Sequence, residues 1–382
     1  MDVYLYNSSG CEWELWFFFQ DRLLFQQHIR AMGSNLEEQE LWVLREALGY
    51  TLQAPPDCKQ TTVWMHAETL PKSLHSPEIQ LPFLEKKPFL EVKALLACQP
   101  QTTIRIADAS VFHRKAPENP GTSPAPLRVG LAQVPSKTSH PEENLEILRQ
   151  IVRQALREQV SWLFFPEVHL CGFPSFAREK PLELRDSWVE QQMCAQLRDD
   201  PRGQMVLGVG WFSRNDNRLF NRYGLFSQEG LLFSQDKHRL FSLAGENALI
   251  SPGKKPAPFW LHAIRSQLVN CYELRFSNLF FPPSSSLFPP EIFVVPASWP
   301  KQRQEAWENL LVARALETQA FVVGVNRTGG NGLYAGGSMV VDPEGKILLE
   351  PDSSSALKTI DLDFRQVERL RKNFPFLVER YS

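Results

Sequence analysis

The chain has 382 residues, of which 43% are hydrophobic and 22% are charged, and its formal net charge is −2. This composition is that of a globular protein with a full core, and the length favours two domains. A net charge this close to zero gives no electrostatic case for a nucleic-acid or acidic-membrane partner. No uninterrupted apolar run reaches the ~20 residues of a membrane-spanning helix, and the first residues lack an export signal pattern. We therefore expect a cytoplasmic protein with no nucleic-acid or membrane partner.

The spacing of cysteine and histidine gives no sign of a metal centre or a disulfide framework. The six cysteines form no C-x-x-C pair, and the eight histidines form no H-E-x-x-H pair. Scattered cysteines in a chain of this size are typical of a reducing compartment. We expect no metal, no cofactor and no disulfide. The cysteines are Cys11, Cys58, Cys98, Cys171, Cys194 and Cys271.

Residues 1–116 are predicted to form an α+β domain. Runs rich in Tyr, Trp, Phe and Leu predict three consecutive strands. A capping-box pattern at Ser34 and Glu37 then predicts a helix with leucines on one face. A fourth strand, a second helix and a fifth strand complete the order βββαβαβ. The expected strands are 2–7, 12–20, 22–29, 61–65 and 102–107, and the expected second helix is 89–96.

The order of elements in residues 1–116 resembles that of ribonuclease-H-like folds. Asn7 and His66 stand where such enzymes need acidic metal ligands, so we do not expect nuclease activity. We interpret this domain as a packing or partner-binding module of unknown role. Residues 117–126 contain four prolines and one glycine, a composition that sustains neither a helix nor an inner strand. We predict a linker there and a second domain at 127–382.

Strands and helices alternate in the second domain, which favours an α/β layered architecture. Pro141 begins a helix whose apolar residues recur at helical spacing. A second amphipathic helix is expected at 302–318 and a charged helix at 364–372. The expected strands are 127–134, 162–165, 205–212, 223–227, 231–235, 259–270, 292–296, 321–326, 337–341, 346–349 and 357–362.

Three reactive side chains stand just beyond the ends of expected strands, namely Glu167, Lys237 and Cys271. A thiol attacks only as a thiolate and needs a base or a cation nearby, and a carboxylate and an ammonium supply both. Taken singly, each residue has a more ordinary explanation. A lone buried cysteine is usually a packing residue, and charged residues after strands usually face solvent. The functional argument therefore depends on their order and local sequence.

The chain reads F-P-E followed by G-F around Glu167, D-K-H-R-L-F around Lys237, and C-Y-E-L-R-F around Cys271. In this order the motifs resemble those of the carbon-nitrogen hydrolase (nitrilase) superfamily, whose members use a Glu-Lys-Cys triad on a four-layer α-β-β-α sandwich. The resemblance covers residues 127–382. The stretches R-A-L-E-T-Q and V-N-R-T-G later in the domain are most similar to the omega-amidase branch.

The resemblance implies an amidase that hydrolyses a small omega-amide of a dicarboxylic or 2-oxo acid, such as 2-oxoglutaramate. Ammonia would be released and a thioester would form on Cys271. Glu167 would move the protons, while Lys237 and the backbone N–H of Tyr272 would hold the oxyanion. Glu246 would orient the lysine, and relatives usually pair as homodimers. The residues implied to be catalytic are Glu167, Lys237, Cys271 and Glu246, and those implied to contact substrate are Tyr272 and Trp299.

The chain departs from the superfamily pattern at Glu273, where aspartate is usual, and at Ser277, where proline is usual. These changes remove no member of the triad, but they leave the substrate preference open. Arg239 and Arg327 are candidates for binding a substrate carboxylate, and the sequence does not choose between them. One alternative is another carbon-nitrogen hydrolase, an N-carbamoyl amine hydrolase or a nitrilase. The other is a catalytically silent scaffold whose N-terminal domain binds a partner.

Overall fold

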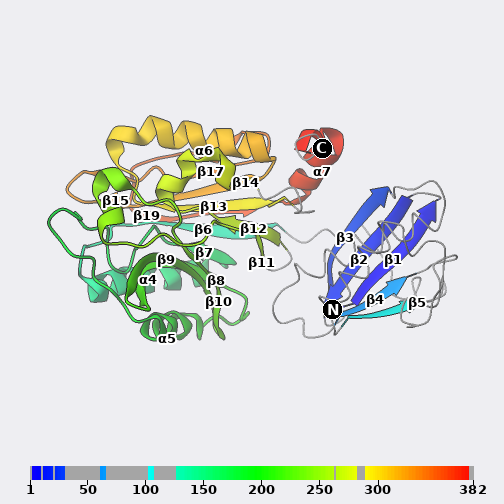
Figure 1. Ribbon diagram of the computed structural model, residues 1–382, viewed down its shortest axis with the longest axis horizontal. Coiled ribbons are helices and arrows are strands. Elements are labelled where there is room, and N and C mark those ends of the chain that lie inside the picture. The colour runs from blue at the N-terminus through cyan, green and yellow to red at the C-terminus, as the bar shows by residue number, and fades with distance from the viewer. Residues whose placement is uncertain are drawn as a thin grey trace. The chain divides into compact units, whose positions relative to one another are not determined.

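The structure of the protein is a computed structural model (Figure 1). It describes residues 2–9, 12–19, 22–30, 61–65, 102–106, 126–261, 264–281 and 289–377. The N-terminal strands and the residues from 126 onward are described separately below. The helices expected from 34 to 48 and at 89–96, and all but the last residue of the expected linker, lie outside the described residues.

The N-terminal strands form one five-stranded sheet of order β3-β2-β1-β4-β5. The first three strands pair antiparallel, and β4 and β5 continue the sheet from β1 in parallel. All five strands expected from the sequence are present, with ends that differ by at most two residues. Their bounds are β1 Asp2–Ser9, β2 Glu12–Phe19, β3 Arg22–Arg30, β4 Thr61–Met65 and β5 Thr102–Ile106.

A six-stranded sheet of order β10-β9-β8-β7-β6-β19 carries the first part of the C-terminal region. Its centre, β6 to β8, is parallel, and β9, β10 and β19 pair antiparallel with their neighbours. Parallel neighbours need a crossover, and helix α4 supplies the one between β6 and β7. The strands are β6 Leu127–Gln133, β7 Trp162–Phe164, β8 Val206–Asn215, β9 Arg218–Ser227, β10 Gly230–Asp236 and β19 Ala356–Leu362.

A second six-stranded sheet has the order β11-β12-β13-β14-β17-β18. Strands β12, β13 and β14 are parallel, and β17 and β18 return antiparallel. The single run expected at 259–270 is two strands, β11 and β12. The strands are β11 Phe259–Leu261, β12 Ile264–Leu268, β13 Ile292–Ala297, β14 Phe321–Asn326, β17 Met339–Val341 and β18 Ile347–Leu349, and a separate pair is formed by β15 Thr328–Gly329 and β16 Tyr334–Ala335.

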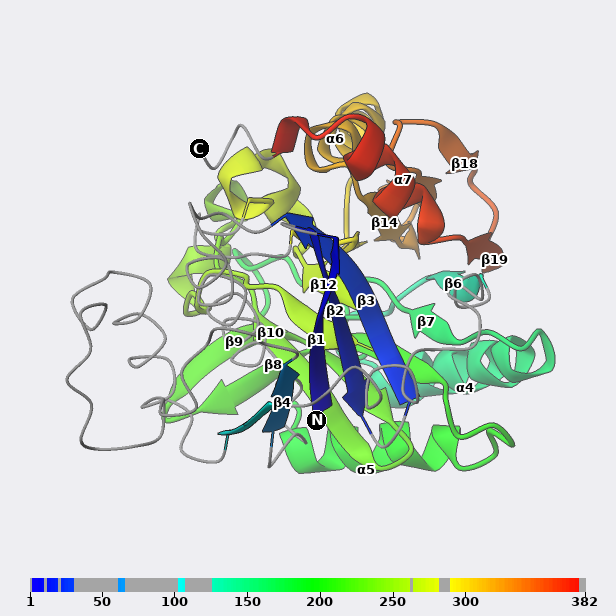
Figure 2. The ribbon, with the colours of Figure 1, turned by 90° about the vertical axis from the view of Figure 1, so that its right-hand side faces the viewer.

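Helices cover the outer faces of the two sheets, so the C-terminal region is a four-layer α-β-β-α sandwich, as expected. Figures 1 and 2 show α4 and α5 along the first sheet and α6 along the second. Helix α7 (Arg365–Asn373) follows β19. None of the described helices combines the length and apolar character needed to cross a bilayer. The covering helices are α4 Pro141–Arg157, α5 Asp186–Leu197 and α6 Gln304–Thr318.

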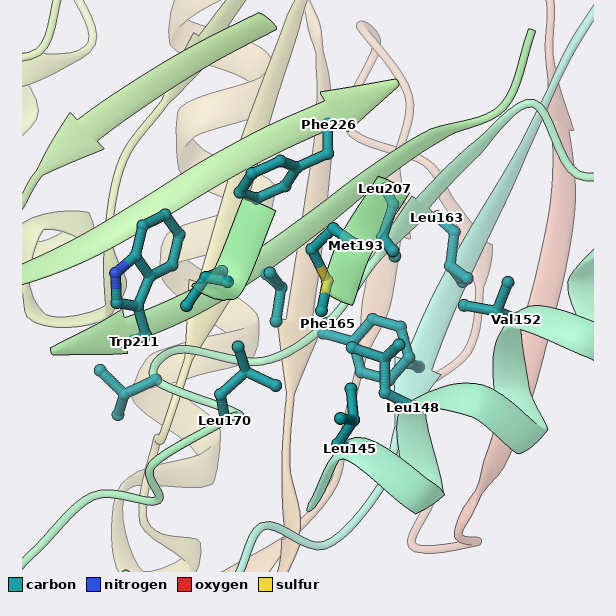
Figure 3. Packing of buried hydrophobic residues seen from close by; sticks show 14 of the residues in the cluster. Leu145, Leu148, Val152, Leu163, Phe165, Leu170, Met193, Leu207, Trp211 and Phe226 are labelled. Atoms are coloured by element: carbon teal, nitrogen blue, oxygen red, sulfur yellow. The ribbon is translucent and has the colours of Figure 1, made fainter. Parts of the chain in front are cut away.

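The core beneath α4 and α5 is built from apolar side chains at helical spacing packed on the first sheet (Figure 3). Leu148 and Val152 of α4 are buried, as the sequence predicted, and meet Leu163 and Phe165 from the β7 segment. Burying a side chain of this size contributes about 1.5–3 kcal/mol. This packing fixes the end of β7, from which Glu167 projects.

Candidate active site

Cys271 stands in a strained turn that begins just after β12. It is the first residue of a short 3-10 helix, Cys271–Arg275, and its φ of 50° lies in the left-handed region. A residue other than glycine persists there only when its surroundings hold it. The Glu273 carboxylate accepts the Asn270 N–H at 2.7 Å, and the Glu273 N–H donates to the Asn270 carbonyl at 3.1 Å. These two bonds close the turn on the cysteine, which is 7% exposed.

Glu167 follows β7 and is completely buried. Val168, the next residue, also has a positive φ, at 42°, so the chain turns sharply behind the carboxylate. Glu167 Oε1 accepts Lys237 Nζ at 2.8 Å and Asn221 Nδ2 at 2.9 Å, while Oε2 accepts the Ser298 N–H at 3.2 Å. Three donors therefore hold the carboxylate in one orientation.

Lys237 follows β10 and has a fully buried ammonium between two carboxylates. Beyond its bond to Glu167, Nζ donates to Glu246 Oε2 at 2.9 Å and to Oε1 at 3.2 Å. Burial alone lowers the pKa of Lys237, but the negative charges of Glu167 and Glu246 outweigh it, and the net pKa is raised. The lysine is accordingly a permanent cation rather than a base.

Glu246 is held in a short 3-10 turn, Glu246–Ala248, that begins after Gly245 in a left-handed conformation. Its Oε2 also accepts the Phe241 N–H at 2.7 Å. Its carboxylate is buried and cannot be a surface charge. Glu246 therefore lies against the Lys237 ammonium, and its role in orienting the lysine stays a prediction.

The thiol of Cys271 is electrostatically coupled to this cluster. Burial raises the pKa of Cys271 well above its ordinary value, and the charge of Glu167 and a hydrogen bond with its carboxylate raise it further. The charge of Lys237 and a hydrogen bond with the Ser298 backbone act in the opposite direction. The resting group is therefore a neutral thiol beside a carboxylate that can accept its proton. The four residues expected to be catalytic are thus brought together.

Tyr272 and Trp299, the two residues expected to contact substrate, have different surroundings. Tyr272 is half-buried, with its ring 4.9 Å from that of Phe241. Trp299 is 3% exposed, and its indole N–H donates to the Arg303 carbonyl at 2.8 Å. The Trp299 side chain is therefore almost fully buried. The preceding residue, Ser298, donates its backbone N–H to Glu167.

Sequence reasoning missed Asn221, a fully buried residue of β9 that donates to both Glu167 and Glu246. The available signal was the side-chain amide of Asn221 within the largely apolar stretch Leu219–Phe226. A polar group in a buried strand has no access to water and needs hydrogen-bond partners within the protein. In the described part of the chain, no group of three or more His, Cys, Asp or Glu side chains could hold a metal ion.

The architecture defines the class of the protein. A solved structure of XC1258 from Xanthomonas campestris matches with a TM-score of 0.59 and 25% identity, covering 66% of this chain and 97% of that chain. It is described as a CN-hydrolase superfamily protein with an arsenic adduct in its active site. The family model described as carbon-nitrogen hydrolase matches residues 128–372. The chain belongs to this family and is a carbon-nitrogen hydrolase, which confirms the resemblance drawn from its motifs.

Two curated relatives match the chain at similar levels. The hydrolase in the agr operon of Staphylococcus aureus is 31% identical over 257 residues, which cover 65% of this chain and 96% of the relative. The omega-amidase YafV of Escherichia coli strain K12 is 30% identical over 221 residues, which cover 56% of this chain and 81% of the relative. The first match shows that a nearly whole relative corresponds to about two-thirds of this chain.

Proposed function

We propose that the protein hydrolyses a small omega-amide of a dicarboxylic or 2-oxo acid through a thioester on Cys271, with release of ammonia. The observation that carries this proposal is the contact of the buried Cys271 thiol with Glu167, itself bonded to Lys237. Similarity to an omega-amidase supports the substrate class. A buried thiol with a carboxylate acceptor and a fixed cation suits acyl transfer at an uncharged carbonyl.

The proposed reaction moves one proton back and forth through Glu167. Cys271 Sγ attacks the amide carbon as Glu167 accepts the thiol proton. The tetrahedral intermediate collapses when Glu167 returns that proton to the departing nitrogen, so ammonia leaves and the thioester remains. Water then attacks the thioester carbon while Glu167 accepts its proton. The C–S bond breaks, the thiol regains a proton, and the carboxylic acid is released. The sum is amide plus water giving acid plus ammonia.

Lys237 balances the charge that develops on the carbonyl oxygen. Its ammonium is already fixed by Glu167 and Glu246, so it needs no reorganisation when the oxyanion forms. The backbone N–H of Tyr272 begins the turn just after the nucleophile and is the second proposed donor. One donor of this kind typically contributes about 3–4 kcal/mol to transition-state stabilisation.

We assign the distal carboxylate of the substrate to Arg327. This side chain is 3% exposed, and its Nε has no hydrogen-bond partner among the described residues. Its guanidinium lies 4.4 Å from the ring centroid of Tyr334 and donates to the Ser136 carbonyl. Described residues offer it no ion-paired carboxylate, and a buried cation of this kind is suited to an anionic ligand. Arg239, the other sequence candidate, is exposed over Phe276.

The test is ammonia release by the full-length protein from a panel of amides. The panel contains omega-amides with a distal carboxylate, matched neutral amides, an N-carbamoyl amine and a nitrile. We expect turnover of the carboxylated amides, and we expect Cys271→Ala to abolish it because thioester formation is lost. Arg327→Met is expected to raise KM for carboxylated amides at least tenfold and to leave neutral amides unchanged.

Arg239→Met and Arg275→Met are the matched controls, because each removes another arginine, one from the lysine motif and one from the cysteine motif. Wild-type turnover of only the carbamoyl amine or nitrile would replace the proposed substrate class. Full activity of Cys271→Ala would refute the mechanism. A KM increase in Arg275→Met rather than in Arg327→Met would move the carboxylate site to the cysteine turn.

A further inference from the structure

Asn221 contacts every member of the buried cluster formed by Glu167, Lys237 and Glu246. Its Nδ2 donates to Glu167 Oε1 and to Glu246 Oε1, both at 2.9 Å. Its Oδ1 accepts from Asn270 Nδ2 at 3.3 Å, and its backbone carbonyl accepts the Lys237 N–H at 2.8 Å. The side chain is fully buried, so water cannot replace any of these bonds.

The orientation of the Asn221 amide is dictated by its partners. Two carboxylate oxygens can only accept, so the nitrogen must face Glu167 and Glu246. The oxygen then faces Asn270, whose Nδ2 can only donate. A flipped amide would set its oxygen against both carboxylates and lose all three bonds. Asn221 is consequently one of few side chains that can serve both sides without adding charge.

The cluster needs a neutral bridge because its charges do not cancel. Within the ion-paired cluster, Glu167 and Glu246 carry two negative charges, and Lys237 supplies one positive charge. Arg327, Tyr334 and Cys271 also interact electrostatically with Glu167. Two carboxylates that share one buried cation repel each other, and one of them tends to take up a proton. Donation from a single amide to both carboxylates offsets this repulsion.

We infer that Asn221 is a positioning residue that holds the Glu167 carboxylate apart from Glu246 and aligned with the cysteine turn. The first effect acts through its two Nδ2 bonds. The second acts through Asn270, which immediately precedes Cys271 and whose backbone is bonded to Glu273. This inference rests on the proposed function, because it assigns Asn221 to the residue that moves the protons.

The inference is tested by the pH dependence of kcat for amide hydrolysis by the full-length Asn221→Ala and Asn221→Asp proteins. Loss of the two donated hydrogen bonds is expected to shift the acidic limb of the profile to higher pH in Asn221→Ala, because hydrogen-bond donors favour a carboxylate over its protonated form. Asn221→Asp keeps the shape but adds a third carboxylate, so its shift is larger. We expect kcat to fall about 10²-fold, as a misplacement of ~1 Å can do, with KM changed less than threefold.

Asn144→Ala is the matched control. Asn144 is another fully buried asparagine, and its side chain bonds to the backbone of Lys137 and Leu170 rather than to a carboxylate. We expect this variant to lose thermal stability without moving the acidic limb. If Asn221→Ala does not fold, the isosteric Asn221→Asp still gives the limb position.

A second readout needs no substrate and separates this inference from the proposed function. Alkylation of Cys271 by iodoacetamide, assisted by Glu167, has its own acidic limb, and we expect the Asn221 variants to shift it upward as well. An unshifted limb in both variants, or a loss of kcat that only matches a loss of folded protein, would overturn the inference. Failure of the wild type on every amide, with the alkylation limb still shifted, would refute the proposed function alone.

Discussion

At the scale of single residues, the determining feature is a neutral thiol paired with a charged carboxylate. The pKa of Cys271 is raised by burial and by Glu167, so a free thiolate is disfavoured at neutral pH. In the proposed mechanism, the sulfur becomes nucleophilic only as its proton moves to Glu167. In that mechanism Glu167 has two opposed effects, because it raises the pKa of the resting thiol and also accepts its proton during attack.

This opposition predicts an unusual outcome for Glu167→Gln. Removal of the negative charge lowers the pKa of Cys271, because Lys237 and the Ser298 N–H still favour the thiolate. Removal of the proton acceptor is nevertheless expected to lower kcat by about 10²–10⁴-fold, the usual contribution of general base catalysis. The measurements are the thiolate absorbance near 240 nm against pH and the rate of ammonia release.

Cys271→Ala supplies the baseline for the other cysteines, since its absorbance change is subtracted from that of each protein. A higher thiol pKa in Glu167→Gln than in the wild type would contradict the charge coupling. Retained hydrolysis in that variant would show that another group accepts the proton.

The motifs predicted the members of the cluster but not what joins them. Glu167, Lys237, Glu246 and Cys271 each stand in a recognisable local pattern. Asn221 is separated from its three side-chain partners by 54, 25 and 49 residues, so only the fold brings them together. That Trp299 contacts substrate stays a prediction, and the sequence did not show that its indole N–H donates to the Arg303 carbonyl. A motif reports local sequence and does not report which way a side chain turns.

At the scale of elements, helices with a clear apolar stripe were predictable and the others were not. Helix α4 begins at a proline and buries five residues, four of them apolar and at helical spacing, whereas α5 has no such contrast between its faces. The alternation of strands and helices was predicted correctly. The division of the run 259–270 into the two strands β11 and β12 was not predicted. Apolar runs show where strands lie, and pairing decides where each one ends.

Gly210 of strand β8 supports the turn that carries Glu167, and substitution of this glycine tests that support. A Cβ on Gly210 would lie 2.4 Å from the Val168 nitrogen and 3.3 Å from the Glu167 carbonyl carbon. The clash is with backbone, so Gly210→Ala must displace the turn that carries Glu167. We expect kcat to fall about tenfold to 10²-fold per folded molecule, since small misplacements of catalytic groups are costly. Ammonia release and thermal unfolding should be measured on the same sample.

Gly324→Ala, in strand β14, is the matched control for Gly210→Ala. Its Cβ would meet the Leu311 and Trp307 side chains of α6 at 2.6 and 2.7 Å, so the conflict lies in the core. Overpacking of this kind costs about 1–3 kcal/mol of stability. We expect this variant to unfold at lower temperature with an unchanged kcat. Equal kcat losses in both variants would mean that Gly210 acts through general stability and not through the Glu167 turn.

At the scale of the whole molecule, the hydrolase activity should belong to the C-terminal two-thirds of the chain. Every residue of the cluster lies between Glu167 and Cys271, and the family match covers 128–372. A relative matched over 96% of its length uses only 65% of this chain. We therefore predict that a protein consisting of residues 117–382 folds and keeps kcat within about threefold of the full-length value.

An insoluble product, or one that is folded but inactive by ammonia release, would show that residues 1–116 complete the hydrolase core or its site. A KM increase with unchanged kcat would instead assign them to substrate access, because the chemistry would be intact while binding changed.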